Sequence, residues 1–181
     1  FTDADHSKLN AIEASATADQ TDAEIRTAAR LSFIATSNIG LGANAVDSIT
    51  TGDYNVGLGD NAGTAITEGV YNTAVGYQAL KVNTTGEQNT AIGASAGDAI
   101  TSGDFNTAVG YRALTTTTTA DSNTAVGTQS LELNTTGANN TATGYHSLKA
   151  NTTGGDNVAL GKSALQANTT GAGNTSIGIA S

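Results

Sequence analysis

The sequence predicts a mainly β protein, a parallel β-solenoid or β-roll, and three observations lead to this prediction. A 17-residue motif recurs without a slip from residue 38 to residue 181, glycines recur at fixed positions within it, and charged residues are confined to a few positions. A fixed period of this kind is typical of a chain that forms one structural unit per repeat. We therefore expect eight full coils and a truncated ninth, stacked about 4.8 Å apart.

Each copy of the repeat opens on an Asn, whose position we call offset 0. Offset 4 is Gly in all nine copies, offset 12 is Thr in the eight that reach it, and offset 3 is apolar in all but one, where Thr143 stands. Equivalent residues of successive coils are predicted to stack into ladders, with Asn amides bonding to the next coil. The predicted structural ladders are Asn38, Asn55, Asn72, Asn89, Asn106, Asn123, Asn140, Asn157 and Asn174, and Gly42, Gly59, Gly76, Gly93, Gly110, Gly127, Gly144, Gly161 and Gly178.

Within each coil the composition favours strands over helices. Two glycines and several threonines per repeat are poor helix formers, and apolar residues do not recur at helical spacing, which argues against a 34-residue helical hairpin. β-branched residues beside Gly and Asn corners favour short strands. We predict two strands per coil, at about offsets 1 to 5 and 7 to 11.

The positions of the charges predict which surfaces are covered. Every charge of the repeat falls at offsets 5, 6, 9, 13, 15 or 16, so these offsets are expected to face solvent. Offsets 2 and 4 are small and offset 3 is branched and apolar, so both faces of the first strand lack charge. One face lines the coil interior, and another copy of the chain is the simplest cover for the other. The pattern predicts self-association without fixing the number of copies.

Composition narrows the classes of function. The net charge is −9 and only 13% of residues are charged, which disfavours nucleic-acid partners and anionic membrane surfaces. No apolar run approaches the roughly 20 residues that span a bilayer, so no membrane insertion is expected. The chain has no Cys, which removes disulfides and thiolate chemistry. Its start at Phe1 suggests a fragment or a processed product.

Candidate sites for chemistry are few, and we predict no enzyme, no catalytic residue, no metal site and no cofactor. His6 and His146 are the only neutral-pH bases, and surface positions explain both. A carboxylate row at offset 15 suits either a cation or solvated turns. Aromatic rows at offsets 5 and 16 suit sugar stacking, a partner protein or packing between coils. Binding residues stay unknown. The carboxylates are Asp53, Glu87, Asp104 and Asp121, and the aromatic residues are Tyr77, Tyr111, Tyr145, Tyr54, Tyr71 and Phe105.

Residues 1–37 do not repeat, and residues 38–181 form the predicted β-solenoid domain. Thr2 with Asp5 and Thr21 with Glu24 have the spacing of a capping box at the start of a helix. We therefore predict that residues 1–37 are a short helical segment that caps the first coil and protects its edge.

The motifs N-T-A-V-G-Y-Q-A-L, at residues 72–80, and N-T-T-G resemble head repeats of trimeric autotransporter adhesins and similar repeats of bacteriophage tail fibres. The resemblance covers residues 38–181 and implies a left-handed parallel β-roll in a homotrimer. Residues 1–25 resemble a short module of phage tail-fibre sequences, which favours the phage assignment. The 17-residue coil is longer than the usual adhesin unit.

The tail-fibre resemblance implies a structural protein of the virion, a shaft that holds a receptor-binding tip and takes part in host attachment. Its partners would be other copies, other fibre or virion proteins, and a host surface glycan or receptor. The alternative is an extracellular adhesin head on the bacterial cell surface, which binds host matrix or cells. A third hypothesis, an ice-binding solenoid, rests on the unbroken Thr row at offset 12.

Overall fold

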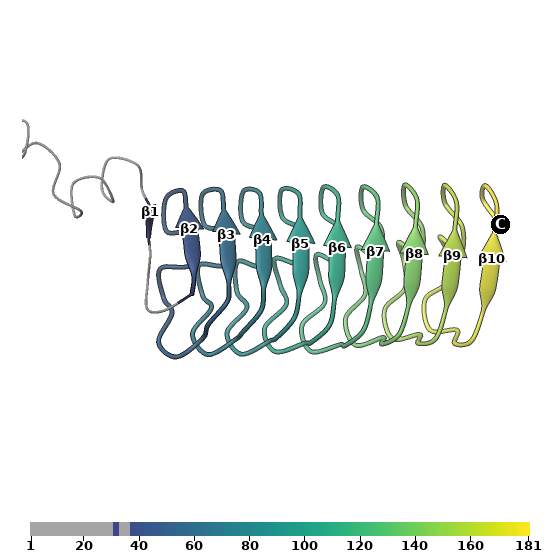
Figure 1. Cartoon of the computed structure of the whole chain (residues 1–181). Coiled ribbons are helices and arrows are strands. Elements are labelled where there is room, and N and C mark those ends of the chain that lie inside the picture. Colours follow the sequence, from purple (N-terminus) through teal and green to yellow (C-terminus); the bar gives the residue numbers. More distant parts are fainter. Residues whose placement is uncertain (1–30, 33–36) are drawn as a thin grey trace, which may run out of the picture.

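The computed structural model describes residues 31–32 and 37–181, which form one ten-stranded sheet with its strands side by side along a rod (Figure 1). From β2 onward each strand pairs in parallel with the strand 17 residues away, as Ala74 does with Ala91. The parallel β-solenoid and its 17-residue coil are therefore confirmed. The strands are β1 Leu31–Ser32, β2 Ile39–Leu41, β3 Val56–Leu58, β4 Thr73–Val75, β5 Thr90–Ile92, β6 Thr107–Val109, β7 Thr124–Val126, β8 Thr141–Thr143, β9 Val158–Leu160 and β10 Thr175–Ile177.

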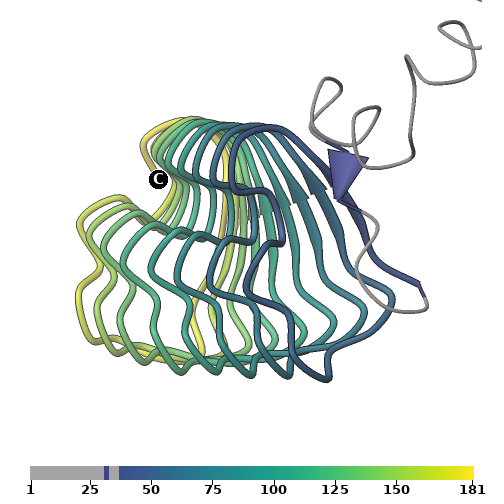
Figure 2. The same ribbon diagram turned by 90° about the vertical axis from the view of Figure 1, so that its left-hand side faces the viewer.

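Each coil has one three-residue strand, at offsets 1 to 3, so the predicted second strand at offsets 7 to 11 is wrong. Left-handed backbone interrupts the chain there: in the coil of β4, φ is 129° at Gly76, 60° at Gln78 and 47° at Leu80. These turns still bond to the next coil, because the Leu80 N–H donates to the Ala96 carbonyl at 3.1 Å. Successive coils therefore keep one outline, as Figure 2 shows from the end of the rod.

The narrow apolar core is filled from two alternative positions. Ala side chains at offset 2, such as Ala74 and Ala91, are fully buried behind the strands. Deeper in the coil, Leu80 at offset 8 fills the space in one coil, while its neighbour has Gly97 at offset 8 and Ile100 at offset 11. From the second coil to the eighth, a large side chain at one of these offsets is matched by a small or polar residue at the other, and the core keeps its packing.

Buried Asn side chains bond the coils to one another. Asn55 Oδ1 accepts hydrogen bonds from the backbone N–H of Asn72 at 2.9 Å and from its Nδ2 at 3.1 Å. Asn72 Nδ2 also donates to the Gly86 carbonyl at 2.8 Å, in the turn that closes the same coil. Since an unpaired buried amide is costly, this repeated arrangement both satisfies the opening Asn and fixes the spacing of the coils.

A second, shorter Asn ladder occupies offset 11 of the sixth to eighth coils, and Asn83 stands outside it. Asn151 Nδ2 donates to Asn134 Oδ1 at 2.9 Å, but both polar side-chain atoms of the fully buried Asn83 lack a hydrogen-bond partner. The reason is the core alternation: the neighbouring coils present Ile66 and Ile100 at this offset, and neither can bond to an amide.

The predicted helical segment at residues 1–37 is wrong where the structure describes it. No helix occurs in the described part of the chain, and residues 31–32 form the strand β1. Leu31–Ser32 is a strand antiparallel to β2, with Ser32 opposite Gly40. The physical reason is that the first strand of a parallel stack presents unpaired backbone groups, and pairing with β1 satisfies them. The two capping-box patterns lie outside the described residues.

Candidate interaction surface

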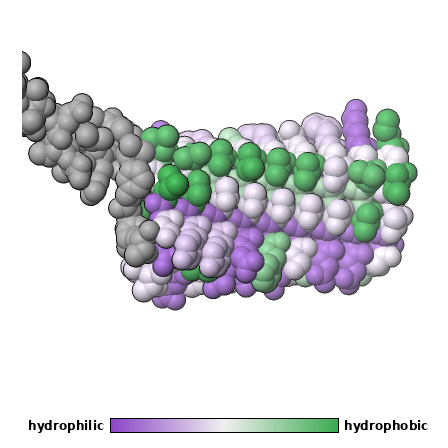
Figure 3. Space-filling view, viewed as in Figure 1, coloured by the Kyte–Doolittle hydropathy of each residue, from purple (hydrophilic) through white to green (hydrophobic). Residues whose placement is uncertain are grey.

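One face of the sheet is left uncovered, and we call it the outward sheet face. It consists of the side chains at offsets 1 and 3 of β2 to β10, which point away from the buried offset 2. Offset 3 forms a mostly apolar row along the rod, interrupted at Thr143, beside a row that is mostly Thr (Figure 3). Ile92 is 42% exposed and Leu160 is 47% exposed. An apolar row of this length that is at least partly exposed, with one interruption at Thr143, is typical of an interaction surface.

The outward sheet face is bordered by two rows of larger side chains. The offset-5 edge follows the strands and contains Tyr77, Tyr111 and Tyr145, while the offset-16 edge precedes them and contains Tyr71 and Phe105. All five rings are about half exposed. A Tyr side chain combines an apolar ring with a polar hydroxyl, which suits the rim of a protein interface where water remains.

Packing between neighbouring coils explains only part of the aromatic pattern. Tyr54 and Tyr71 of adjacent coils stack with ring centroids 4.9 Å apart, whereas Tyr145 stacks at 3.7 Å on His146 of its own coil. Within residues 31–32 and 37–181, Tyr77, Tyr111 and Phe105 make no ring contact. These three rings remain available to a partner.

The Thr row at offset 12, which motivated the ice-binding hypothesis, is used in the fold. Thr84 Oγ1 donates to the Thr101 carbonyl at 3.1 Å, and Thr135 Oγ1 donates to the Thr152 carbonyl at 2.9 Å. Six of the eight hydroxyls in this row donate to the next coil in this way, so most of the row does not present free donors to an ice lattice.

The carboxylate row at offset 15 also bonds to the backbone. Asp104 Oδ1 accepts the Glu87 N–H at 2.7 Å, and Asp121 Oδ1 accepts the Asp104 N–H at 2.9 Å. These carboxylates therefore serve as acceptors for turn N–H groups. In the described part of the chain, no group of three or more acidic or His side chains is placed to hold a metal ion.

One charged side chain is buried although its offset predicted exposure to solvent. Glu132, at offset 9, is only 5% exposed, although that offset was expected to face solvent. Its carboxylate lies 3.3 Å from Arg112 Nη2 and 3.2 Å from Lys149 Nζ, in the coils on either side. Gln129 Nε2 donates to both carboxylate oxygens, at 2.9 and 3.0 Å. Burial of this charge is tolerated because every oxygen is paired.

His146 continues this cluster. Because Gln129 donates from Nε2, its Oε1 is an acceptor, and His146 Nε2 donates to it at 2.7 Å. Burial, together with Lys149 and Lys162, lowers the pKa of His146 below its ordinary value against the pull of Glu132. Burial raises the pKa of Glu132, but hydrogen bonds from Gln129 and Lys149 and the charges of Lys149 and Arg112 outweigh it and hold that pKa low.

Both shifts predict that acid destabilises the fold. The unfolded Glu132 carboxyl binds a proton at higher pH than the folded one, so stability present above about pH 4.5 is lost as the pH falls through the folded pKa. The unfolded His146 also binds its proton first, so stability falls below about pH 6.5. We expect the urea midpoint to drop in two stages between pH 7.5 and pH 3.5.

Two variants show which residue causes each stage of the fall in the urea midpoint. His146→Gln should remove the loss near pH 6, and Glu132→Gln should remove the stage below pH 4.5 while lowering the midpoint at pH 7. Glu68→Gln, which changes an exposed carboxylate of another coil, is the control. If Glu132→Gln left the pH dependence of the urea midpoint unchanged, the assignment of the lower stage to Glu132 would be contradicted.

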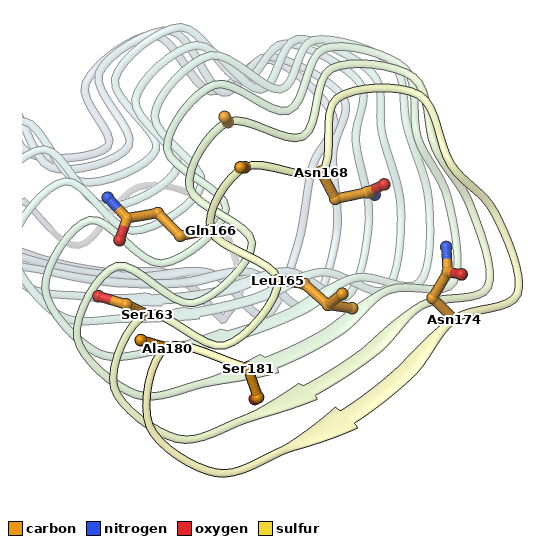
Figure 4. Close-up of a pocket in the computed structure, with 9 residues that line it drawn as sticks. Ser163, Leu165, Gln166, Asn168, Asn174, Ala180 and Ser181 are labelled. Atoms are coloured by element: carbon orange, nitrogen blue, oxygen red, sulfur yellow. The ribbon is translucent and has the colours of Figure 1, made fainter.

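A hollow lies at the C-terminal end of the rod (Figure 4). No side chain that lines it is ionisable, and the lining residues belong to the seventh, eighth and ninth coils. Its lining residues are Ala150, Ser163, Leu165, Gln166, Ala167, Asn168, Asn174, Ala180 and Ser181.

The fold and this surface define a class of protein, a parallel β-solenoid with an uncovered apolar sheet face. No family model, curated protein or solved structure matches the chain. The part of the chain that the structure describes contains no helix of the length and apolarity needed to cross a bilayer.

Proposed function

We propose that this chain is a non-enzymatic structural rod that associates with copies of itself through the outward sheet face. The observation that supports the proposal is the row at offset 3, which is apolar in eight of nine coils and is partly or largely exposed to solvent in a single chain. Covering such a row removes apolar surface from water, which favours association at about 25 cal/mol per Å² before the costs of binding.

The assembly that we propose is a homotrimer that forms part of the shaft of a phage tail fibre. The sequence resemblance supports three copies and a place on the virion, where the rod would hold a receptor-binding tip away from the particle. Ladder hydrogen bonds and a narrow apolar core suit this task, because they give stiffness without large side chains. Other fibre or virion proteins would continue the shaft, and a host glycan or receptor would be bound at its tip. The head of a bacterial surface adhesin is the alternative.

Light scattering on the purified chain tests the assembly. We expect three times the chain mass of 17.9 kDa. Leu160→Asp and Ile92→Asp place charges on the outward sheet face and should produce folded monomers, whereas Leu133→Asp, an exposed apolar residue at offset 10, is the matched control. A monomer mass for the unaltered chain would refute self-association.

Location and role need a separate experiment. Antibodies against the rod should label tail fibres along the shaft in electron micrographs of phage particles. The fluorescently labelled rod should not bind bacterial or host cells, since a shaft carries no receptor site. Saturable binding to host matrix or cells would support the adhesin alternative instead.

A further inference from the structure

Two tyrosines of the first and second coils are stacked face to face. Tyr54 and Tyr71 both occupy offset 16, and their ring centroids lie 4.9 Å apart with an angle of 3° between the ring planes. The backbone holds the two positions together, because the Tyr71 N–H donates to the carbonyl of Asp53 in the preceding coil at 3.0 Å. Equivalent positions of hydrogen-bonded coils are about 4.8 Å apart, so the stacking follows from the fold.

The turn at offset 16 does not itself require an aromatic residue. The backbone φ is 60° at Tyr54 and 59° at Tyr71, in the left-handed region that favours Gly, Asn and Asp. Later coils place Asn139 and Asp156 in the same conformation at this offset. The reason for two successive tyrosines therefore lies in their side chains.

The two rings form an accessible and isolated pair of phenols. Tyr54 is 53% exposed and Tyr71 is 56% exposed, so an oxidant in solution reaches both rings. Their neighbours at offset 16 are Ser37 and Gln88, which carry no phenol. Within residues 31–32 and 37–181, no other pair of Tyr rings is in contact. The remaining tyrosines stand at offset 5, about 9.6 Å apart along the rod, and are Tyr77, Tyr111 and Tyr145.

We propose that Tyr54 and Tyr71 are a site of oxidative modification, at which the rings are coupled into a dityrosine cross-link between the first and second coils. The oxidant is of the one-electron class, such as the high-valent haem that a peroxidase forms with hydrogen peroxide. This modification goes beyond the proposed function and does not depend on self-association, because both rings belong to one chain.

The coupling proceeds through two tyrosyl radicals. The oxidant removes one electron from each phenol, and each hydroxyl proton passes to water. The unpaired electron is shared with the ring carbons beside the phenol oxygen, Cε1 and Cε2, and one such carbon of each ring joins in a new C–C bond. Each joined carbon then loses its hydrogen as a proton, while each phenol oxygen regains one. In sum the pair gives up two electrons and two protons, which reduce one hydrogen peroxide to two waters.

The stacked arrangement favours coupling within the chain over coupling between chains. Two reacting groups held side by side in one molecule behave as if they were highly concentrated. The rings must turn to bring two Cε atoms to bonding distance, and exposed side chains make such rotations within nanoseconds. The new bond joins residues 17 apart and restrains the chain when the two coils separate, so it reinforces the rod.

Oxidation of the purified chain with a haem peroxidase and hydrogen peroxide tests the site. A protease that cuts after Glu separates Tyr54 from Tyr71 at Glu68, so the cross-link appears in mass spectrometry as two joined peptides that have lost two hydrogen atoms. We expect this product and dityrosine fluorescence in chains that run at 17.9 kDa on a denaturing gel after boiling. Absence of dityrosine, or dityrosine only between chains, would overturn the proposal.

Three variants show whether the stacked pair directs the reaction. Tyr71→Phe keeps the ring but removes the phenol hydroxyl and should abolish the product. Tyr77→Phe is the matched control, because Tyr77 lies in the same peptide as Tyr71 after cleavage at Glu, and should leave the yield unaltered. Tyr54→Phe with Gln88→Tyr moves the pair one coil along offset 16 and should restore a cross-link to Tyr71. If this double variant formed none, or if Tyr71→Phe kept the product, stacking at offset 16 would not direct the coupling.

The reinforcing effect has its own measurement. The oxidised chain should unfold at a higher urea concentration than oxidised Tyr71→Phe, with no such difference between the two proteins before oxidation. Equal midpoints after oxidation would refute the reinforcement. Light scattering reports on assembly independently, so a monomer would overturn the proposed function and leave the expected cross-link unaltered.

Discussion

Replacing Gly110 with Ala is expected to lower the free energy of unfolding by about 2–5 kcal/mol. Gly110 has φ of 133°, a backbone conformation that residues with a Cβ rarely adopt. A Cβ placed there would lie 2.6 Å from the carbonyl oxygen of Gly127, in the next coil. The atoms in the way belong to the backbone and cannot turn aside as a side chain can, so the two coils would have to move apart. The midpoint of urea unfolding, followed by circular dichroism, measures the loss.

Gly173→Ala is the matched control for this prediction. Gly173 has φ of 70°, and no atom lies within 4 Å of the position that its Cβ would occupy. Backbone strain alone should therefore cost about 1–2 kcal/mol. Equal losses at Gly110 and Gly173 would show that the close approach of the coils does not decide stability.

The second large effect concerns the alternation of Leu and Ile in the core. Leu80→Gly should destabilise the fold by about 2–5 kcal/mol, because it leaves a cavity where a fully buried side chain stood. Asn83→Ile alone removes the unpaired amide but adds volume to a filled core, which costs about 1–3 kcal/mol. Together they give the coil the Gly and Ile of its neighbours, and we expect the double variant to equal or exceed the unaltered chain in stability.

A double-mutant cycle in urea tests this expectation, and the coil of β7 offers a control. Leu131→Gly with Asn134→Ile makes the same exchange, but Asn134 is fully paired there. Its Nδ2 donates to the Gly137 carbonyl at 2.8 Å, and its Oδ1 accepts from Asn151 at 2.9 Å. The exchange in this coil should remain destabilising. Additive losses in the coil of Leu80 would refute the compensation.

The contacts between coils also give the rod its stiffness. A rod transmits position only if its coils cannot slip, and the glycine contacts and Asn ladders both fix each coil against the next. A variant such as Gly110→Ala should therefore shorten or bend the rod in electron micrographs before it changes any binding property.

The repeat period was enough to predict the coil and the residues that stack. Gly76 and Gly93 are stacked because any chain that winds once in 17 residues must place them together, whatever its path between. The period also indicated the uncovered apolar face, since Val75 lies between two small residues on one strand. Alternation of side chains along a strand needs no tertiary information.

The path of the chain between the ladders was decided only in the folded structure. The apolar pattern at offsets 7 to 11 suits a strand, but left-handed residues such as Gln78 and Leu80 turn the backbone there. Leu has no local preference for that conformation, so packing of its side chain into the core must select it. For the same reason β1 was not foreseen, because its partner is the free edge of β2, which exists only after the coils have stacked.

The sequence by itself thus determined the 17-residue coil, the Asn and Gly ladders and the apolar outward sheet face, because a strict period imposes the same neighbours on every copy. The tertiary structure decided the number of strands per coil, the cap formed by β1 and the burial of Glu132 between Arg112 and Lys149. Those features depend on the path of the backbone within a coil, on a segment outside the repeat and on how deeply one side chain is buried, and a period specifies none of these.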